Sequence, residues 1–239
     1  MTNGVSNFPR LYLMQVVVAP SVPCYLVQTQ DGKNVLIDSG LPAQMPEGFQ
    51  LPANLPPPQF GKNVVEQLAE LGLQPGDIDL LICTHFDLDH SGHHDAFTNA
   101  ELVVQRSHYE LARSGYQRFA ANRSHWDHPA LRYRLIDGDT ELLPGIELIE
   151  TSGHTVGHQS ALVRLPETGA VLLTIDAIAL QQQFRPDREL SPFDEKNLEV
   201  VQASARKLID IAQREQALVI FGHDTEQWQT LKKAPEFYS

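Results

Sequence analysis

The chain has 239 residues, and 42% of them are apolar, which is enough for a buried core in one large domain or two small ones. It carries 18 basic and 30 acidic residues, so its formal net charge is −12. A negative overall field repels phosphate backbones and anionic lipid headgroups, which argues against nucleic acid or a membrane surface as the partner.

The sequence predicts neither membrane insertion nor secretion. The apolar run at residues 11–20 is too short to span a bilayer and lacks the basic lead-in and cleavage pattern of a secretion signal. We therefore expect a cytoplasmic protein. The two cysteines, Cys24 and Cys83, do not suggest a disulfide framework, and the apolar run around Cys83 is typical of a small buried side chain.

The first half of the chain predicts strands followed by a helix. Alternating apolar runs favour three consecutive antiparallel strands, at 11–18, 22–28 and 33–37. Six prolines over 42–58 exclude a regular helix or central strand, so we expect a surface loop, either a lid or a subunit contact. A helix is predicted over 62–71 and ends at Gly72.

The second half repeats this layout after a strand at 79–83. Further strands are expected at 101–105, 132–136, 146–150, 159–165, 170–175 and 217–222. One helix is predicted from Ser107, a longer one over 194–213 with Asp194 and Glu195 in its first turn, and a short one at the end. These elements predict the α/β class, a four-layer αββα sandwich in a single domain over 1–239.

The most informative segment is THFDLDH, residues 84–90, which follows the strand predicted at 79–83. It places four side chains of metal-ligand type where a strand has ended and no helix has begun: His85, Asp87, Asp89 and His90. Such side chains can turn inward together around divalent cations. The alternative, a polar turn in which Asp89 caps a helix, does not account for all four residues.

Three more candidate ligands each follow a predicted strand: His154 in TSGHTVGH, Asp176 in VLLTIDA and His223 in LVIFGHD. Strand ends on one edge of a sheet meet in space, so all seven side chains can form one site. The ordinary alternatives are a tight turn at His154, a strand-end cap at Asp176 and a surface position for His223.

With these motifs the chain resembles the metallo-β-lactamase superfamily, from LIDSG at 36–40 to the terminal FGHD. GHTVGHQS and FGHD are similar to the signatures of its quorum-quenching branch, the N-acyl homoserine lactonases. The resemblance implies the metallo-β-lactamase type of αββα sandwich and two divalent metal ions, zinc foremost, with iron or manganese as alternatives. By resemblance the ligands are, for the first metal, His85, Asp87 and His154; for the second, Asp89, His90 and His223; and, for both, Asp176.

Two residues depart from the lactonase pattern. That branch shows His-x-His-x-Asp-His, whereas this chain has Asp87 at the second histidine, which adds negative charge and shifts the metal preference towards iron or manganese. The branch also carries a tyrosine three positions after the bridging residue, where this chain has Ala179. Losing a hydrogen-bond donor to the substrate carbonyl typically costs about 2.7–4 kcal/mol of transition-state stabilisation. The candidate replacements for this donor are Tyr116, His125 and Tyr133.

We interpret the chain as a metal-dependent hydrolase that opens a lactone or related ester, a small-molecule substrate, by attack of a metal-bridging hydroxide. The resemblance makes Asp89, with Asp87 as the alternative, the residue that passes a proton to the departing alkoxide. The alternatives are a diiron oxidoreductase related to the flavodiiron proteins, which also have a carboxylate at position 87, a thioesterase or other ester hydrolase, and a non-enzymatic binding module. Phosphodiesters fit less well because few cationic residues lie near the motifs. Relatives suggest a homodimer.

Several further residues are expected to support the site. By resemblance Asp38 orients a metal-bound histidine, although an Asx turn is the alternative. His93 and His94 are expected either around the ligands or facing solvent, and Asp224 in support of the ligands, rather than on the metals. Four aromatic residues belong either to a substrate pocket or to the core: Tyr116, Phe119, Trp126 and Tyr133.

Overall fold

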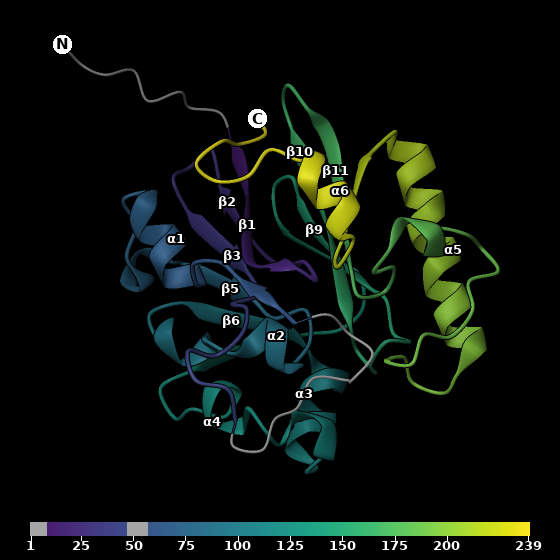
Figure 1. The fold of residues 1–239 in the computed structure, drawn as a ribbon, viewed down its shortest axis with the longest axis horizontal. Coiled ribbons are helices and arrows are strands. Elements are labelled where there is room, and N and C mark those ends of the chain that lie inside the picture. The colour runs from purple at the N-terminus through teal and green to yellow at the C-terminus, as the bar shows by residue number, and fades with distance from the viewer. Residues whose placement is uncertain (1–8, 47–56) are drawn as a thin grey trace.

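Two β-sheets face each other in the computed structural model, which describes residues 9–46 and 57–239 (Figure 1). The strands are β1 (Arg10–Ala19), β2 (Val22–Gln28), β3 (Asn34–Ile37), β4 (Gln59–Phe60), β5 (Leu80–Ile82), β6 (Glu101–Gln105), β7 (Arg132–Ile136), β8 (Thr140–Leu143), β9 (Ile146–Glu150), β10 (Gln159–Leu165), β11 (Gly169–Ile175) and β12 (Leu218–Phe221). The α-helices are α1 (Val64–Glu70), α2 (Leu88–Ser91), α3 (Arg106–Arg113), α4 (Arg123–Trp126), α5 (Leu198–Glu215) and α6 (Thr225–Thr230).

The first sheet has the strand order β4-β1-β2-β3-β5-β6-β7, and the second has the order β12-β11-β10-β9-β8. Strands β3, β5, β6 and β7 run parallel, as do β11 and β12, while the other neighbours are antiparallel. Parallel neighbours end at the same edge of a sheet, so the loops after β3 and β5 come together, and so do those after β11 and β12.

Alternation along the strands builds the layers. In β1, Leu11 and Leu13 face the second sheet in the central core, whereas Tyr12 and Met14 face the helices that cover the first sheet. In the second sheet, Leu162 packs in a third cluster with residues of α5. The helices α1 to α4 lie on one outer side and α5 on the other (Figure 1). The result is the predicted αββα order of layers.

Most predicted elements are confirmed. The three N-terminal strands pair antiparallel, and four later strands have the predicted bounds: 101–105, 132–136, 146–150 and 159–165. Residues 47–56 of the proline-rich segment lie outside the described residues, so the expected lid or subunit contact stays a prediction.

The start predicted for the long helix is wrong. Helix α5 begins at Leu198, because Asn197 caps it by accepting a hydrogen bond from the backbone N–H of Val200. Asp194 and Glu195 therefore precede the helix, and they line the functional site instead. The short strands β4 and β8 were not predicted.

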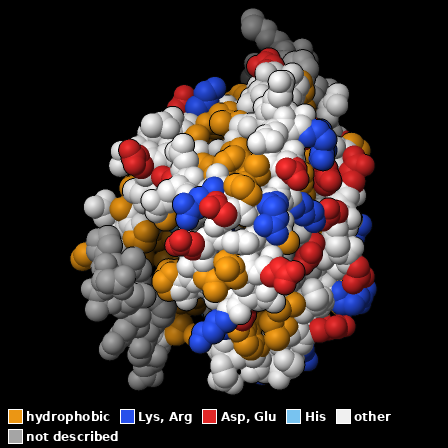
Figure 2. Space-filling model, turned by 90° about the vertical axis from the view of Figure 1, so that its right-hand side faces the viewer, with side chains coloured by type: hydrophobic (Ala, Val, Ile, Leu, Met, Phe, Trp, Pro, Cys, Tyr) orange, Lys and Arg blue, Asp and Glu red, His pale blue; other side chains and the backbone are white. Residues whose placement is uncertain are grey.

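Charges of both signs are interspersed over the face that carries α5 (Figure 2). Acidic and basic side chains alternate there with scattered apolar ones, so the net negative charge does not gather into one patch on this face. Across the described residues, the structure contains no helix with the length and apolar character needed to cross a bilayer.

Candidate metal centre

The first sheet supplies the histidine-rich segment. Strand β5 ends at Ile82, and His85 follows it fully buried. Asp87 is the N-cap residue of α2, but its side chain makes no capping hydrogen bond. The carboxylate faces His85 and His154 instead. Asp89 and His90 lie within α2. The capping-turn alternative, with Asp89 as the N-cap, is therefore not what the structure shows.

The second sheet supplies the other three candidates. His154 lies in the loop between β9 and β10, Asp176 follows β11 directly, and His223 follows β12. All three come from loops at the ends of strands that face the β5 loop, so the two sheets contribute jointly. The structure thus brings the seven predicted side chains to one place.

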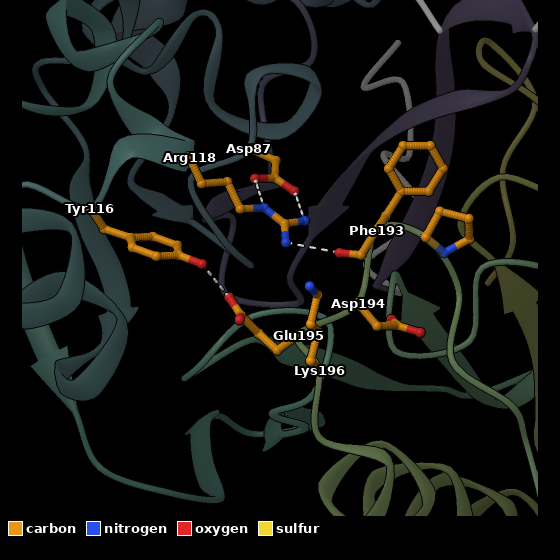
Figure 3. A pocket seen from close by; sticks show the side chains of 8 residues that line it. Asp87, Tyr116, Arg118, Phe193, Asp194, Glu195 and Lys196 are labelled. Atoms are coloured by element: carbon orange, nitrogen blue, oxygen red, sulfur yellow. Dashed lines mark hydrogen bonds and ion pairs between the residues drawn. The ribbon is translucent and has the colours of Figure 1, made fainter.

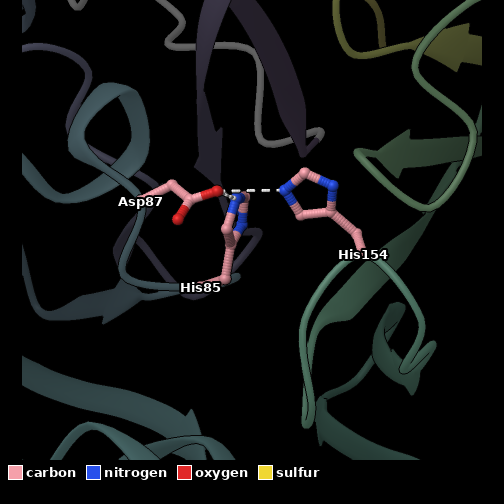
Figure 4. Close-up of side chains that lie close together, drawn as sticks. All are labelled: His85, Asp87 and His154. Atoms are coloured by element: carbon pink, nitrogen blue, oxygen red, sulfur yellow. Dashed lines mark hydrogen bonds and ion pairs between the residues drawn. The ribbon is translucent and has the colours of Figure 1, made fainter. Parts of the chain in front are cut away.

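The first ligand group consists of His85, Asp87 and His154, whose ligand atoms all lie within 4.8 Å of one another (Figure 4). Asp87 Oδ2 is 3.3 Å from His85 Nε2 and 3.0 Å from His154 Nε2. Asp176 Oδ2 is 3.9 Å from His85 Nε2 and 3.3 Å from His154 Nε2. Ligands about 2.0–2.1 Å from a tetrahedral metal lie roughly 3.3 Å apart, so this spacing fits one cation.

The second ligand group consists of Asp89, His90 and His223. His90 Nε2 is 3.7 Å from Asp89 Oδ2, and His223 Nε2 is 3.8 Å from the same oxygen. The other carboxylate oxygen of Asp176, Oδ1, is 3.4 Å from His90 Nε2 and 2.9 Å from His223 Nε2. The two oxygens of Asp176 therefore face different ligand groups.

Buried atoms without partners support metal binding. His85 Nε2, His90 Nε2 and Asp176 Oδ1 are buried and form no hydrogen bond among the described residues. Leaving such atoms unpaired destabilises a fold, and a cation would satisfy all three. The donor set, spacing and burial thus fit two divalent cations.

The electrostatics keep the carboxylates ionised. Burial raises the pKa of Asp176, but His223, His90 and His154 more than offset this and hold it well below its usual range. The pKa of Asp87 is likewise lowered, because His85, His154 and Arg118 outweigh burial. Burial disfavours the protonated form of His154, yet Asp176, Asp194 and Asp87 raise its pKa to about 9. Each carboxylate is thus in the state that binds cations.

A surrounding layer of hydrogen bonds orients the ligands. His90 Nδ1 is 2.8 Å from Asp38 Oδ2, and His223 Nδ1 donates to the carbonyl of Ser21 at 2.6 Å. His154 Nδ1 makes an ion-pair contact instead, 3.7 Å from Asp194 Oδ1. Because the Nδ1 atoms are occupied in this way, the Nε2 atoms face the centre of the site.

The flanking residues His94 and Asp224 belong to neither ligand group. His94 is buried, and its Nδ1 is 2.7 Å from Ser39 Oγ. Asp224 accepts the backbone N–H of Gln227 and caps α6. Of the four aromatic residues, Phe119 and Trp126 are buried in the core, and Tyr133 donates to the carbonyl of Trp126.

A cavity of about 500 Å³ opens beside Asp87 (Figure 3). Its lining consists of Asp87, Tyr116, Arg118, Pro192, Phe193, Asp194, Glu195 and Lys196. Of the three candidate replacements for the tyrosine missing at position 179, Tyr116 lines this cavity. Its hydroxyl donates a hydrogen bond to Glu195 at 2.7 Å. His125 is instead 2.7 Å from Asp95.

Sequence reasoning missed three residues of the site. Arg118 contacts Asp87 through both carboxylate oxygens, and Asp194 supports His154. His158 Nε2 accepts the backbone N–H of Asp176 at 3.3 Å, which steadies the shared carboxylate. Only His158 carried a signal, since it is the second histidine of GHTVGH. Arg118 and Lys196 also place more positive charge near the site than the motifs suggested.

The fold and this arrangement define the class of protein. The sequence profile described as "Metallo-beta-lactamase superfamily" matches residues 18–223, and the chain belongs to this superfamily. The predicted fold class and the predicted hydrolase class are thereby confirmed.

Known lactonases are similar over most of the chain. An N-acyl homoserine lactonase of Bacillus thuringiensis is 34% identical over 223 residues, which covers 90% of this chain and 85% of the relative. The lactonase AttM of Rhizobium johnstonii is 34% identical over 233 residues, covering 91% and 87%. A solved N-acyl homoserine lactone hydrolase with N-hexanoyl-L-homoserine at its catalytic metal centre has a TM-score of 0.82 and 28% identity, covering 96% of this chain and 98% of that one.

Proposed function

We propose that this chain opens a lactone of the N-acyl homoserine lactone kind, or a related ester, with two divalent cations held by the seven residues. The observation that carries this proposal is the division of the Asp176 oxygens between the two ligand groups. A carboxylate shared by two sets of donors is a recurring feature of two-metal hydrolases. The similarity to lactonases supports the substrate class.

Cations bound in these groups would polarise the substrate carbonyl and make hydroxide available from water near neutral pH, and zinc, iron and manganese all suit the donor set. The rest of the chemistry belongs to the side chains. The shared carboxylate of Asp176, whose backbone N–H donates to His158, fixes the two ligand groups relative to each other. The cavity lining combines charged residues with Tyr116, Pro192 and Phe193, so it offers both polar and apolar contacts to an acyl group.

Asp89 is assigned the proton transfer. Its side chain is 31% exposed, against 16% for Asp87 and 9% for Asp176, so it is the carboxylate most open to substrate. No hydrogen bond from a described residue occupies its oxygens. It takes a proton from the attacking water and gives it to the alkoxide as the ester C–O bond breaks, yielding an alcohol and an acid. Asp87 is less suited because Arg118 engages both of its oxygens.

The test is a panel of short- and long-chain N-acyl homoserine lactones, other lactones, thioesters and aryl esters, assayed after reconstitution with zinc, iron, manganese or cobalt. Acid release should be seen with lactones and should disappear in His90→Ala. Asp89→Asn, which keeps an oxygen ligand but loses the charge, should bind the second cation more weakly and, at saturating metal, lower kcat about 10²–10⁴-fold. His128→Ala, which alters a histidine outside both ligand groups, is the matched control and should retain full turnover.

Two results would end the proposal: full lactone turnover by His90→Ala, or fewer than one bound cation per folded chain. A thioesterase would respond to thioesters alone in the same panel. Size-exclusion chromatography with light scattering tests the expected homodimer.

A second candidate, a diiron oxidoreductase, is favoured by the additional carboxylate of Asp87 in the first ligand group. Iron-loaded protein would then absorb visible light and consume oxygen or nitric oxide with an electron donor, and it would leave lactones intact.

A further inference from the structure

Arg118 reaches into the first ligand group from a short 3₁₀ helix, Gln117–Phe119 (Figure 3). Its Nε donates to Asp87 Oδ1 at 2.7 Å and its Nη2 to Asp87 Oδ2 at 2.5 Å. Its Nη1 donates to the carbonyls of His154, at 3.1 Å, and Phe193, at 2.8 Å. The guanidinium is therefore fixed on three sides, and the bidentate pair with Asp87 is of the strong, charge-assisted kind.

The same guanidinium also contacts atoms that a cation would need. Its Nη2 lies 2.8 Å from His154 Nε2, in addition to its bond with Asp87 Oδ2. These are the atoms that face His85 and Asp176 in the first ligand group. Arginine has no acceptor atom, and its Nη2 lies on the side of His154 Nε2 from which a metal would bind that nitrogen.

The second ligand group differs in this respect. Within 9–46 and 57–239, no lysine or arginine forms an ion pair with Asp89 or Asp176, or a hydrogen bond with His90 or His223 Nε2. A divalent cation there meets carboxylates and imidazoles without a neighbouring guanidinium. Like charges a few ångströms apart repel, so a fixed positive charge weakens cation binding more at the first group than at the second.

We infer that Arg118 is a positioning residue that competes with the first cation, so that the two ligand groups bind divalent cations with unequal affinity. The second group fills first. The first group fills weakly, and only when Nη2 leaves His154 Nε2. Arg118 also balances the charge that Asp87 adds where lactonases carry a neutral imidazole. The inference rests on the proposed function, because both groups must hold cations.

The experiment titrates metal-free protein with Zn²⁺ in competition with a chromophoric chelator, which measures affinity without an activity assay. The native chain should bind two ions with dissociation constants at least tenfold apart. Arg118→Met, which keeps much of the side-chain length and removes the charge, should tighten the weaker site at least tenfold and change the tighter site less than threefold. Arg113→Met, which removes a surface arginine paired with Asp127, is the control and should change neither.

Two further variants identify the sites. His223→Ala should remove the tight site, and His85→Ala should remove the weak one. If Arg118→Met does not fold, as judged by its thermal unfolding, Arg118→Gln makes the same test while it can still bond to the Phe193 carbonyl. Arg118→Lys retains the charge and should keep the weak site weak.

The inference is overturned if the two sites are equal in the native chain, or if removal of the Arg118 charge leaves the weaker site unchanged or weaker still. It is also overturned if His85→Ala removes the tight site. Two equal sites would leave the proposed function intact. Folded protein that binds no Zn²⁺ in any variant would reject the proposed function together with this inference.

Discussion

The carboxylate oxygen Oδ2 of Asp38 lies 2.8 Å from Nδ1 of His90, and both side chains are fully buried. The same carboxylate accepts the backbone N–H and the hydroxyl of Thr84, at 2.8 and 2.7 Å. Asp38 follows β3 with a φ of 57°, a conformation that aspartate and asparagine adopt more readily than most residues. The carboxylate thus fixes the imidazole with Nε2 towards Asp176, which agrees with the orienting role rather than with a simple turn.

The substitution Asp38→Asn should weaken metal binding at the second ligand group. Asparagine has nearly the same shape as aspartate and tolerates this backbone conformation, but it lacks the negative charge that holds His90. We expect the cation affinity of that group to fall about 10–100-fold, measured by Zn²⁺ competition. Asp31→Asn, in the exposed turn between β2 and β3, is the control. An Asp38→Asn protein with native affinity would show that the contact does not orient the ligand.

Removal of the Arg188 charge should strongly destabilise the folded chain. Its guanidinium pairs with both oxygens of Asp194, at 2.7 and 3.1 Å, and each side chain is 1% exposed. Arg188→Met leaves the Asp194 carboxylate buried without its cation, so we expect the free energy of unfolding to fall by about 3–5 kcal/mol. Urea denaturation measures this change.

The comparison for Arg188 is Arg185→Met, which removes exposed pairs with Asp187 and Glu189. Exposed pairs contribute about 0–1 kcal/mol, so this variant should remain close to the native chain. Equal losses in both variants would contradict the role of burial.

Elements and ligands that are concentrated in a short stretch of sequence could be predicted. The strands 101–105 and 159–165 are short runs rich in apolar residues, and THFDLDH places its four ligands within six consecutive positions, from His85 to His90. Strand β8 pairs only at the sheet edge, and its four residues are too few to establish a period. The single domain over 1–239 and the cytoplasmic location remain predictions.

Arg118 could not be predicted, because nothing local to it signals a partner. It lies 31 residues from Asp87 in a segment without periodic apolar residues, and only the folded chain brings the two together. Asp194 was misplaced for a related reason. Acidic residues near a helix start favour its first turn, but Asn197 caps α5 and leaves Asp194 free to pair with Arg188.

Stability should fall as the pH decreases from 6.5 towards 4, partly because of His108. This side chain is fully buried; its Nε2 accepts the N–H of Phe86, its Nδ1 lies 2.7 Å from the Val156 carbonyl, and burial lowers its pKa to about 4. Between about 6.5 and 4 the unfolded chain binds a proton here and the folded chain does not, so stability rises with pH in this window. The expected contribution is about 2 kcal/mol between pH 7 and pH 5.

Urea denaturation at several pH values tests this dependence in His108→Gln. Glutamine does not titrate, so the slope of stability against pH should become shallower even though the variant is less stable at pH 7. His128→Gln serves as the control and should keep the native slope. An unchanged slope in His108→Gln would assign the acid sensitivity to other buried histidines, such as His94, whose pKa burial lowers to about 3.

Gly92 should tolerate no side chain, because it packs against the loop that follows Asp38. Its N–H donates to the Gly40 carbonyl at 2.7 Å, and a Cβ at this position would overlap the backbone nitrogen of Pro42. Backbone must therefore move, which typically costs about 1–3 kcal/mol, and α2 carries Asp89 and His90 with it. Gly92→Ala should lower both the free energy of unfolding and the Zn²⁺ affinity of the second ligand group. Gly76→Ala is the control, because its Cβ would meet only the end of the Asn99 side chain, at 3.2 Å. It should change neither the free energy of unfolding nor the Zn²⁺ affinity. If Gly92→Ala also left both quantities unchanged, the loop after Asp38 would have to adjust without moving the ligands.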